Sequence, residues 1–159
     1  MPFYVTQMDD KHVPHHIIAA SNGMITSVAI LCFTCIATGV TVFALRPDLG
    51  STSVAVCYFT QWFKRFGGSA VLWSNNAATY LAEMMTTVAE LTGNRRRIKT
   101  TLASHAMYAE QRLGVLTRVM EEAFMQGQLR SEQDLQLAAA GAEMEINHFT
   151  LCDGATPME

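Results

Sequence analysis

The hydrophobic pattern of the chain is dominated by one uncharged run from Met24 to Leu45. The run holds 22 residues and ends at Arg46 and Pro47. A helix rises about 1.5 Å per residue, so about 20 apolar residues cross a hydrocarbon core of about 30 Å. The run therefore predicts a transmembrane helix over 24–45. Two alternatives remain open: a central helix of a soluble bundle, or strands, although strands rarely exceed about ten residues.

The next segment, 51–73, is apolar and aromatic until two cations interrupt it. Those cations would lie near the middle of a second membrane span. We therefore predict an interfacial amphipathic helix over 51–73, because aromatic and basic side chains favour the head-group region. A helix packed in a soluble core and a second or re-entrant span are the alternatives. The predicted membrane-interface residues are Tyr58, Trp62, Phe63, Lys64 and Arg65.

A spacing of three and four residues between apolar positions predicts a helical region over 74–148. Gly93-Asn94 is a helix-stop signal, so the region is either one long helix or a hairpin. Ser131 is placed to cap a last short helix that ends near Asn147. The predicted partner contacts are the apolar residues of this seam: Leu81, Met84, Val88, Leu91, Leu102, Leu113, Leu116 and Met120.

These segments predict an all-α protein. It has a single transmembrane helix, then an interfacial helix and a long helical, hairpin or coiled-coil-like region. Residues 1–23 are interpreted as an N-terminal arm and 149–159 as a flexible tail. Lys11 precedes the run, whereas Arg46, Lys64 and Arg65 follow it. Basic residues favour the cytoplasmic side, which predicts a single-pass membrane protein with its C-terminal region in the cytoplasm.

Charge is distributed unevenly along the chain. The net charge is −3, and only 16% of the residues are charged. Residues 103–159 hold nine acidic and three basic side chains, which argues against nucleic acid as a partner of that end. The densest basic segment, 95–99, could instead contact phosphate or pair with the acidic end. Nucleic acid is therefore not expected as a partner.

The candidate chemistry is sparse. Glu145 and His148 have the i, i+3 spacing of metal ligands in helical bundles, but a second such pair is missing. His12, His15 and His16 lie in the predicted arm and lack a fixed geometry. Cys32 and Cys35 have the spacing of a redox pair, but their apolar surroundings favour inert thiols. We predict no metal site, no cofactor and no enzymatic activity.

The sequence therefore predicts a non-catalytic structural or accessory subunit of a larger membrane assembly. Its expected partners are membrane lipids and either other subunits or copies of itself. One alternative is a membrane-perforating or channel-forming oligomer, such as a phage ejection component. A second alternative is a metal-binding oxidoreductase subunit that uses Glu145 and His148.

Overall fold

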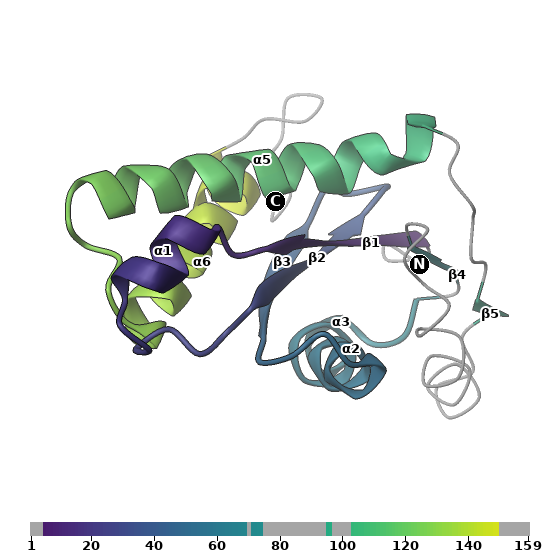
Figure 1. Ribbon diagram of the computed structural model, residues 1–159. Coiled ribbons are helices and arrows are strands. Elements are labelled where there is room, and N and C mark those ends of the chain that lie inside the picture. Colours follow the sequence, from purple (N-terminus) through teal and green to yellow (C-terminus); the bar gives the residue numbers. More distant parts are fainter. Residues whose placement is uncertain (1–4, 70, 75–94, 97–102, 150–159) are drawn as a thin grey trace.

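The computed structural model describes residues 5–69, 71–74, 95–96 and 103–149. Its centre is a five-stranded sheet with the strand order β3-β2-β1-β4-β5 (Figure 1). The strands are β1 (Val5–His12), β2 (Ala29–Cys35), β3 (Thr41–Arg46), β4 (Val71–Ser74) and the two-residue β5 (Arg95–Arg96). β1, β2 and β3 pair antiparallel, whereas β4 pairs parallel with both β1 and β5. The protein is thus a mixed α/β fold, and the prediction of an all-α fold is wrong.

The apolar run that predicted a membrane helix forms the β2–β3 hairpin instead. Gly39 has a φ of 76° in the turn, a backbone conformation that glycine adopts without strain. Every residue of β2 is buried, because helices cover both faces of the sheet. A strand covered on both faces is apolar throughout, so its sequence lacks the alternation that usually marks a strand. No helix in the described part of the chain is long and apolar enough to cross a membrane.

The helices form two layers around the sheet (Figure 1). α5 (Ala103–Met125) crosses one face, which we call the α5 face. A continuous helical rod lies on the opposite face, which we call the α2 face. The rod consists of α2 (Ser51–Cys57), the π-helical η1 (Tyr58–Phe63) and α3 (Lys64–Phe66). The remaining helices are α1 (His15–Ala20), α6 (Glu132–Met144) and η2 (Glu145–Phe149).

The aromatic residues assigned to a membrane surface lie in the core of the α2 face. Tyr58 and Trp62 are both 0% exposed and pack against β2 residue Phe33. The indole Nε1 of Trp62 donates a hydrogen bond to Ser69 Oγ at 3.2 Å. Phe63 packs at the margin of this core, and Lys64 beyond it is exposed. A location in the membrane is therefore not supported for this segment, and the predicted lipid contacts are wrong.

The core of the α5 face is built mainly from aliphatic side chains. Leu113, Leu116 and Met120 of α5 pack there with Ile30 and Cys32 of β2. Their assignment to partner contacts stays a prediction. The other seam residues, Leu81, Met84, Val88, Leu91 and Leu102, lie outside the described residues. Most of the predicted helical region up to residue 102 is likewise outside them.

α6 and η2 protect the edge strand β3 with side chains. Asn147 accepts a hydrogen bond from Thr41 N–H at 2.9 Å and donates one to Thr41 C=O at 2.8 Å. Glu143 accepts from Phe43 N–H at 2.7 Å. These bonds occupy backbone groups that would otherwise be open to another strand. Ser131 is the N-cap of α6, and its side chain accepts from Asp134 N–H in a capping box, so the predicted cap is confirmed.

Candidate functional site

Strand β1 carries two adjacent acidic residues that lie on opposite faces of the sheet. Successive side chains of a strand alternate between its faces. Gln7 and Lys11 both bond to α5, so Asp9 between them belongs to the α5 face. Asp10 bonds to Arg46 on the α2 face. The predicted N-terminal arm therefore holds a central strand, and its two carboxylates have different surroundings.

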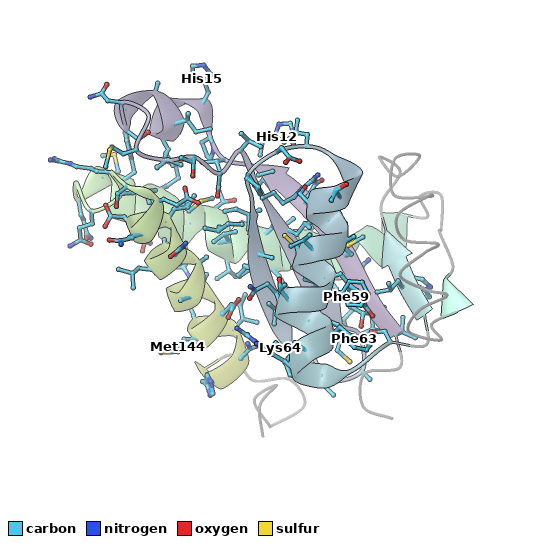
Figure 2. The ribbon with its side chains drawn as sticks, turned by 90° about the horizontal axis from the view of Figure 1, so that it is seen from below. His12, His15, Phe59, Phe63, Lys64 and Met144 are labelled. Carbon is cyan, nitrogen blue, oxygen red and sulfur yellow. The ribbon has the colours of Figure 1, made fainter. Side chains whose placement is uncertain are left out.

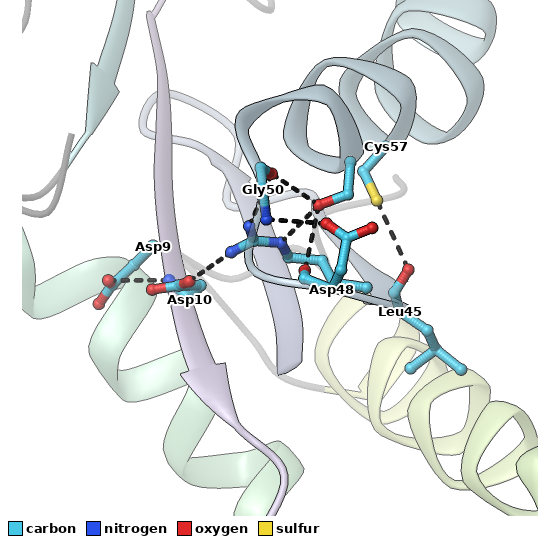
Figure 3. Close-up of polar contacts among 8 residues, drawn as sticks. Asp9, Asp10, Leu45, Asp48, Gly50 and Cys57 are labelled. Carbon is cyan, nitrogen blue, oxygen red and sulfur yellow. Dashed lines mark hydrogen bonds and ion pairs between the residues drawn. The ribbon is translucent and has the colours of Figure 1, made fainter. Parts of the chain in front are cut away.

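Asp10 belongs to a buried polar cluster (Figure 3). The Nη1 atom of Arg46 donates to Asp10 Oδ2 at 2.7 Å, and the Arg46 side chain is 0% exposed. Arg46 also donates from Nε to Ser53 Oγ at 3.2 Å and from Nη2 to Gly50 C=O at 3.1 Å. A buried charge is tolerated when it is paired and hydrogen-bonded in this way. Asp10 therefore forms a structural ion pair with Arg46.

Asp9 lies on β1 between two residues that form hydrogen bonds to α5. Gln7 Oε1 accepts a hydrogen bond from the backbone N–H of Ala109 at 3.1 Å. Lys11 Nζ donates to Thr117 Oγ1 at 2.7 Å. Asp9 is half-buried between these two contacts, and its Oδ1 accepts from the backbone N–H of Asp10 at 2.8 Å, as Figure 3 shows. Glu110 follows Ala109 on α5, and its side chain is exposed.

A cation lies on the same face as Asp9. Asp9 is paired in register with Cys32 of β2, whose thiol is fully buried. Burial raises the pKa of Cys32 to about 12; the charge of Asp9 adds to this increase and that of Arg112 opposes it. Arg112 is buried on α5, where its positive charge favours an anion on this face.

The predicted metal candidates are not brought together. Glu145 forms an ion pair with Arg118, and His148 is exposed on η2. His12 ends β1, whereas His15 points outward from α1 (Figure 2). His16 contacts Glu121 at 3.1 Å on the surface. Within the described ranges, no group of three or more His, Cys, Asp and Glu side chains could hold a metal ion.

The two cysteines with redox spacing cannot pair. Cys32 belongs to the core of the α5 face, whereas Cys35 belongs to the core of the α2 face. An odd separation on a strand always places two side chains on opposite faces. Neither thiol forms a disulfide within the described residues, and both are buried.

A pocket of about 590 Å³ lies elsewhere, at the β3 edge between α2 and α6. Val56, Cys57 and Arg65 line it from the rod, and Ala140 and Glu143 line it from α6. Burial raises the pKa of Glu143, while its bond to Phe43 N–H and the charge of Arg65 oppose the increase. The pocket does not include Asp9 or Glu110 and is separate from the carboxylate site.

The comparisons with known proteins identify the fold. No protein-family model and no curated protein match the chain. The structure is similar to the HTLV-2 integrase catalytic core domain in complex with magnesium, with a TM-score of 0.74, 11% identity and coverage of 99% of this chain and 95% of that chain. It is also similar to the BIV integrase catalytic core domain, with a TM-score of 0.70, 16% identity and coverage of 98% and 91%.

A third similar structure is the simian T-cell lymphotropic virus intasome in complex with the PP2A regulatory subunit B56 gamma. Its TM-score is 0.73 at 13% identity, with coverage of 99% of this chain and 54% of that chain. The fold is that of retroviral integrase catalytic cores. At these identities the likeness shows the fold and leaves the activity of this chain to be argued from its residues.

These findings correct the functional hypotheses. The fold is that of catalytic cores, so a structural subunit anchored in a membrane is wrong, and so are its channel-forming and oxidoreductase alternatives. The expectation of no enzymatic activity is at odds with the enzymes that share the fold. The expectations of lipid partners and of no nucleic-acid partner are also corrected, because the similar chains are integrase cores and an intasome.

Gln7, Asp9 and Arg112 were not predicted from the sequence as candidate site residues. The segment from Val5 to Lys11 held one signal. In a strand, its two adjacent aspartates would lie on opposite faces. The contact between Gln7 and Ala109 joins residues 102 positions apart and leaves no local pattern.

Proposed function

We propose that this chain acts on nucleic acid as an integrase-type catalytic domain, with Asp9 and Glu110 as the ligands of a divalent metal ion. The fold supports the proposal, because the similarity to integrase catalytic cores extends over nearly the whole chain. The main supporting observation is that two side-chain hydrogen bonds join β1 to α5. Asp9 and Glu110 therefore belong to two elements that pack against each other.

The donor set fits magnesium. Mg²⁺ prefers oxygen ligands and is usually bound by one or two carboxylates together with substrate phosphates, so a protein cage of three acids is not needed. Asp9 and Glu110 supply two carboxylates, whereas Asp10 is occupied by Arg46. The HTLV-2 core with the same fold was determined in complex with magnesium. When bound, a divalent ion neutralises charge on the transferring phosphoryl group and activates water.

Basic residues of the chain would contact the nucleic-acid backbone. Arg112 lies on the α5 face, where its positive charge favours a phosphate. β5, which consists of Arg95 and Arg96, pairs with β4, and β4 pairs with β1, so these two residues belong to the same sheet as Asp9. Contacts of this kind position a nucleic acid without reading its sequence.

A cleavage assay with Glu110→Gln tests the proposal. The substrate is a fluorescent DNA duplex, and the reaction is followed with Mg²⁺ or Mn²⁺ and with EDTA. We expect metal-dependent strand cleavage by the wild-type protein and a loss of at least about 100-fold in the variant, since metal stabilisation of the transition state is worth several kcal/mol. The matched control on the same helix is Glu122→Gln, whose exposed side chain contacts Arg118.

The control should cleave DNA at the wild-type rate. If neither the wild-type protein nor the control cleaves DNA or binds Mn²⁺, the proposal is wrong. Equal activity of Glu110→Gln and the control would remove Glu110 from the site.

A further inference from the structure

Strand β3 is the outermost strand beside β2 and directs alternate backbone groups away from the sheet. The C=O groups of Val40 and Arg46 accept hydrogen bonds from the β2 side of the hairpin. In an antiparallel pair every second residue bonds to the partner strand, so the residues between these bond outward. The outward-bonding residues of β3 are Thr41, Phe43 and Leu45.

Most of these outward groups have a partner. Side chains of α6 and η2 bond both backbone groups of Thr41 and the N–H of Phe43. The C=O of Leu45 accepts from Cys57 Sγ at 3.5 Å (Figure 3). No residue that the structure describes bonds to Phe43 C=O or to Leu45 N–H. One acceptor and one donor, on either side of Ala44, are therefore left for a ligand.

Both groups belong to residues that line the pocket between α2 and α6. Phe43, Ala44 and Leu45 all line it, and its volume is about 590 Å³. Sites that bind ligands typically have volumes of about 300–1,000 Å³. One residue of an extended chain beside Ala44 would donate its N–H to Phe43 C=O and accept from Leu45 N–H, as in a parallel ladder. The strand edge in the pocket thus matches a peptide backbone.

Glu143 offers a further acceptor at the same pocket. Its Oε1 is bonded to Phe43 N–H, whereas its Oε2 lies 4.0 Å from Arg65 Nη1, which is longer than a hydrogen bond. The Glu143 side chain is only 21% exposed, and a shielded carboxylate oxygen favours a donor. A second peptide N–H would supply that donor. A cationic ligand would be repelled by Arg65 and a phosphate by Glu143, so a neutral backbone fits both charges.

The walls of the pocket fit a small aliphatic side chain. Ala139 and Ala140 line it from α6, and Val56, which is 53% exposed, lines it from α2. Side chains of an extended peptide alternate between its two sides, so every second one would lie against a helix. The small alanine side chains leave room for an aliphatic group on the α6 side.

We propose that this pocket binds an extended peptide segment of a partner protein, which carries small aliphatic side chains and adds to the edge of β3 beside Ala44. Backbone hydrogen bonds supply the affinity of such a site, and the pocket walls select the side chains. The pocket does not include Asp9 or Glu110, so this inference stands apart from the proposed function.

NMR titration of isotope-labelled protein with a defined peptide tests the proposal. The probe is the capped tripeptide acetyl-Val-Thr-Val-amide, and its matched control has the same side chains with a methyl group on each backbone nitrogen. We expect the probe to bind in the millimolar range and to move the Leu45 amide signal downfield, because that N–H gains an acceptor. The methylated peptide should bind at least about tenfold more weakly, since it has lost its N–H donors.

Two substitutions on α6 locate the binding. Ala140 is exposed and lines the pocket, so Ala140→Trp fills it without disturbing the core and should weaken binding at least about tenfold. The matched control is Gln133→Trp, because Gln133 is exposed, does not line the pocket and lies about 10 Å earlier along the helix. The control should bind within about twofold of wild type. Thermal unfolding shows that both variants are folded.

Four results would overturn the proposal. The first is no change at Leu45 up to the solubility limit of the probe, and the second is equal binding of the methylated peptide. The third is unchanged binding by folded Ala140→Trp. The fourth is a shift of the Leu45 signal by a short DNA duplex, which would assign the pocket to nucleic acid. None of these measurements requires DNA cleavage, so a failure here leaves the proposed function intact.

Discussion

Two adjacent aspartates of β1 have different surroundings because they lie on opposite faces of the sheet. Asp10 faces the rod on the α2 face, where the fully buried Arg46 holds it with one short ion pair. Asp9 faces α5, where it is half-buried and shares its surroundings with Arg112. The residue type is identical, so the neighbouring elements alone decide the role. The Asp10 carboxylate is paired with Arg46, whereas the Asp9 carboxylate lies on the face that also carries Arg112.

The cores on the two faces of the sheet also differ in the side chains that form them. The core of the α2 face consists largely of aromatic rings packed at tilted or edge-on angles, with the centroids of Trp62 and Phe66 4.8 Å apart. The α5 face combines aliphatic packing with buried or half-buried charges. Both faces also hold charged residues: Arg46 and Asp10 pair with each other on the α2 face, whereas the buried Arg112 and the half-buried Asp9 lie on the α5 face.

The largest effect is expected from Trp62→Ala. Trp62 is fully buried, and truncation of such a residue costs about 3–5 kcal/mol through lost contacts and the cavity that remains. Urea unfolding measures the loss. The matched control is Leu137→Ala on α6, because Leu137 is 71% exposed and should cost less than about 0.5 kcal/mol. Equal costs would contradict the assignment of Trp62 to the core.

The next effect is expected from Asp10→Asn. This substitution leaves the buried charge of Arg46 without its carboxylate, which should lower the free energy of unfolding by about 3 kcal/mol. Asp9→Asn should lower it by less than about 1 kcal/mol, because Asp9 is not part of that cluster. Denaturant titration of both variants under one condition tests the comparison. A larger loss in Asp9→Asn would reverse the roles of the two residues.

A smaller effect concerns Cys32 and appears only at alkaline pH. Its pKa is raised from 9.0 to about 12 in the folded protein, chiefly by burial. The neutral thiol is therefore favoured by folding, and this contribution is complete below pH 9 and is lost as the pH rises toward 12. The free energy of unfolding should fall by up to about 1.4 kcal/mol per pH unit over that interval.

Substitutions at Cys32 and at the two aspartates refine this prediction. Cys32→Ala should remove the contribution of this thiol to the alkaline slope. Asp9→Asn should lower the pKa of Cys32, because the charge of Asp9 raises it. Asp10→Asn should leave it unchanged. Alkaline absorbance of the thiolate provides the measurement, and an equal shift in both aspartate variants would refute the separation of the faces.

The smallest effect is expected at the exposed pair of His16 and Glu121. Their side chains are 52% and 41% exposed, and surface pairs contribute about 0–1 kcal/mol. His16→Ala should therefore change the free energy of unfolding by less than about 0.5 kcal/mol at pH 7, as measured by urea unfolding. A loss as large as that of Asp10→Asn would contradict the contrast between buried and exposed ion pairs.

The sequence could predict part of the helical structure and little of the sheet. The last helix follows from Ser131 and Asp134, because a capping box is a local signal. The run from Met24 to Leu45 has the length of a membrane helix, and its division at Gly39 is the only local sign of a hairpin. Its uniform hydrophobicity arises from helices on both faces, which are placed by residues far along the chain.

The site was less predictable than the fold. Gln7 and Ala109 are in contact only because β1 and α5 pack together. The residue pattern within either segment does not predict this contact. If residues 5–12 are known to form a strand, alternation predicts that Asp9 and Asp10 lie on opposite faces. Glu110 is an exposed residue between apolar seam positions of α5, and the seam pattern indicates burial and carries no sign of chemistry.

The central claim is that Asp9, and not Asp10, serves a metal-dependent reaction on nucleic acid. Its most direct test compares Mg²⁺-dependent cleavage of one DNA substrate by wild-type protein, Asp9→Asn and Asp10→Asn, at a temperature where all three are folded. We predict a loss of at least about 100-fold for Asp9→Asn and activity within about threefold of wild type for Asp10→Asn. Full activity of folded Asp9→Asn would contradict the claim.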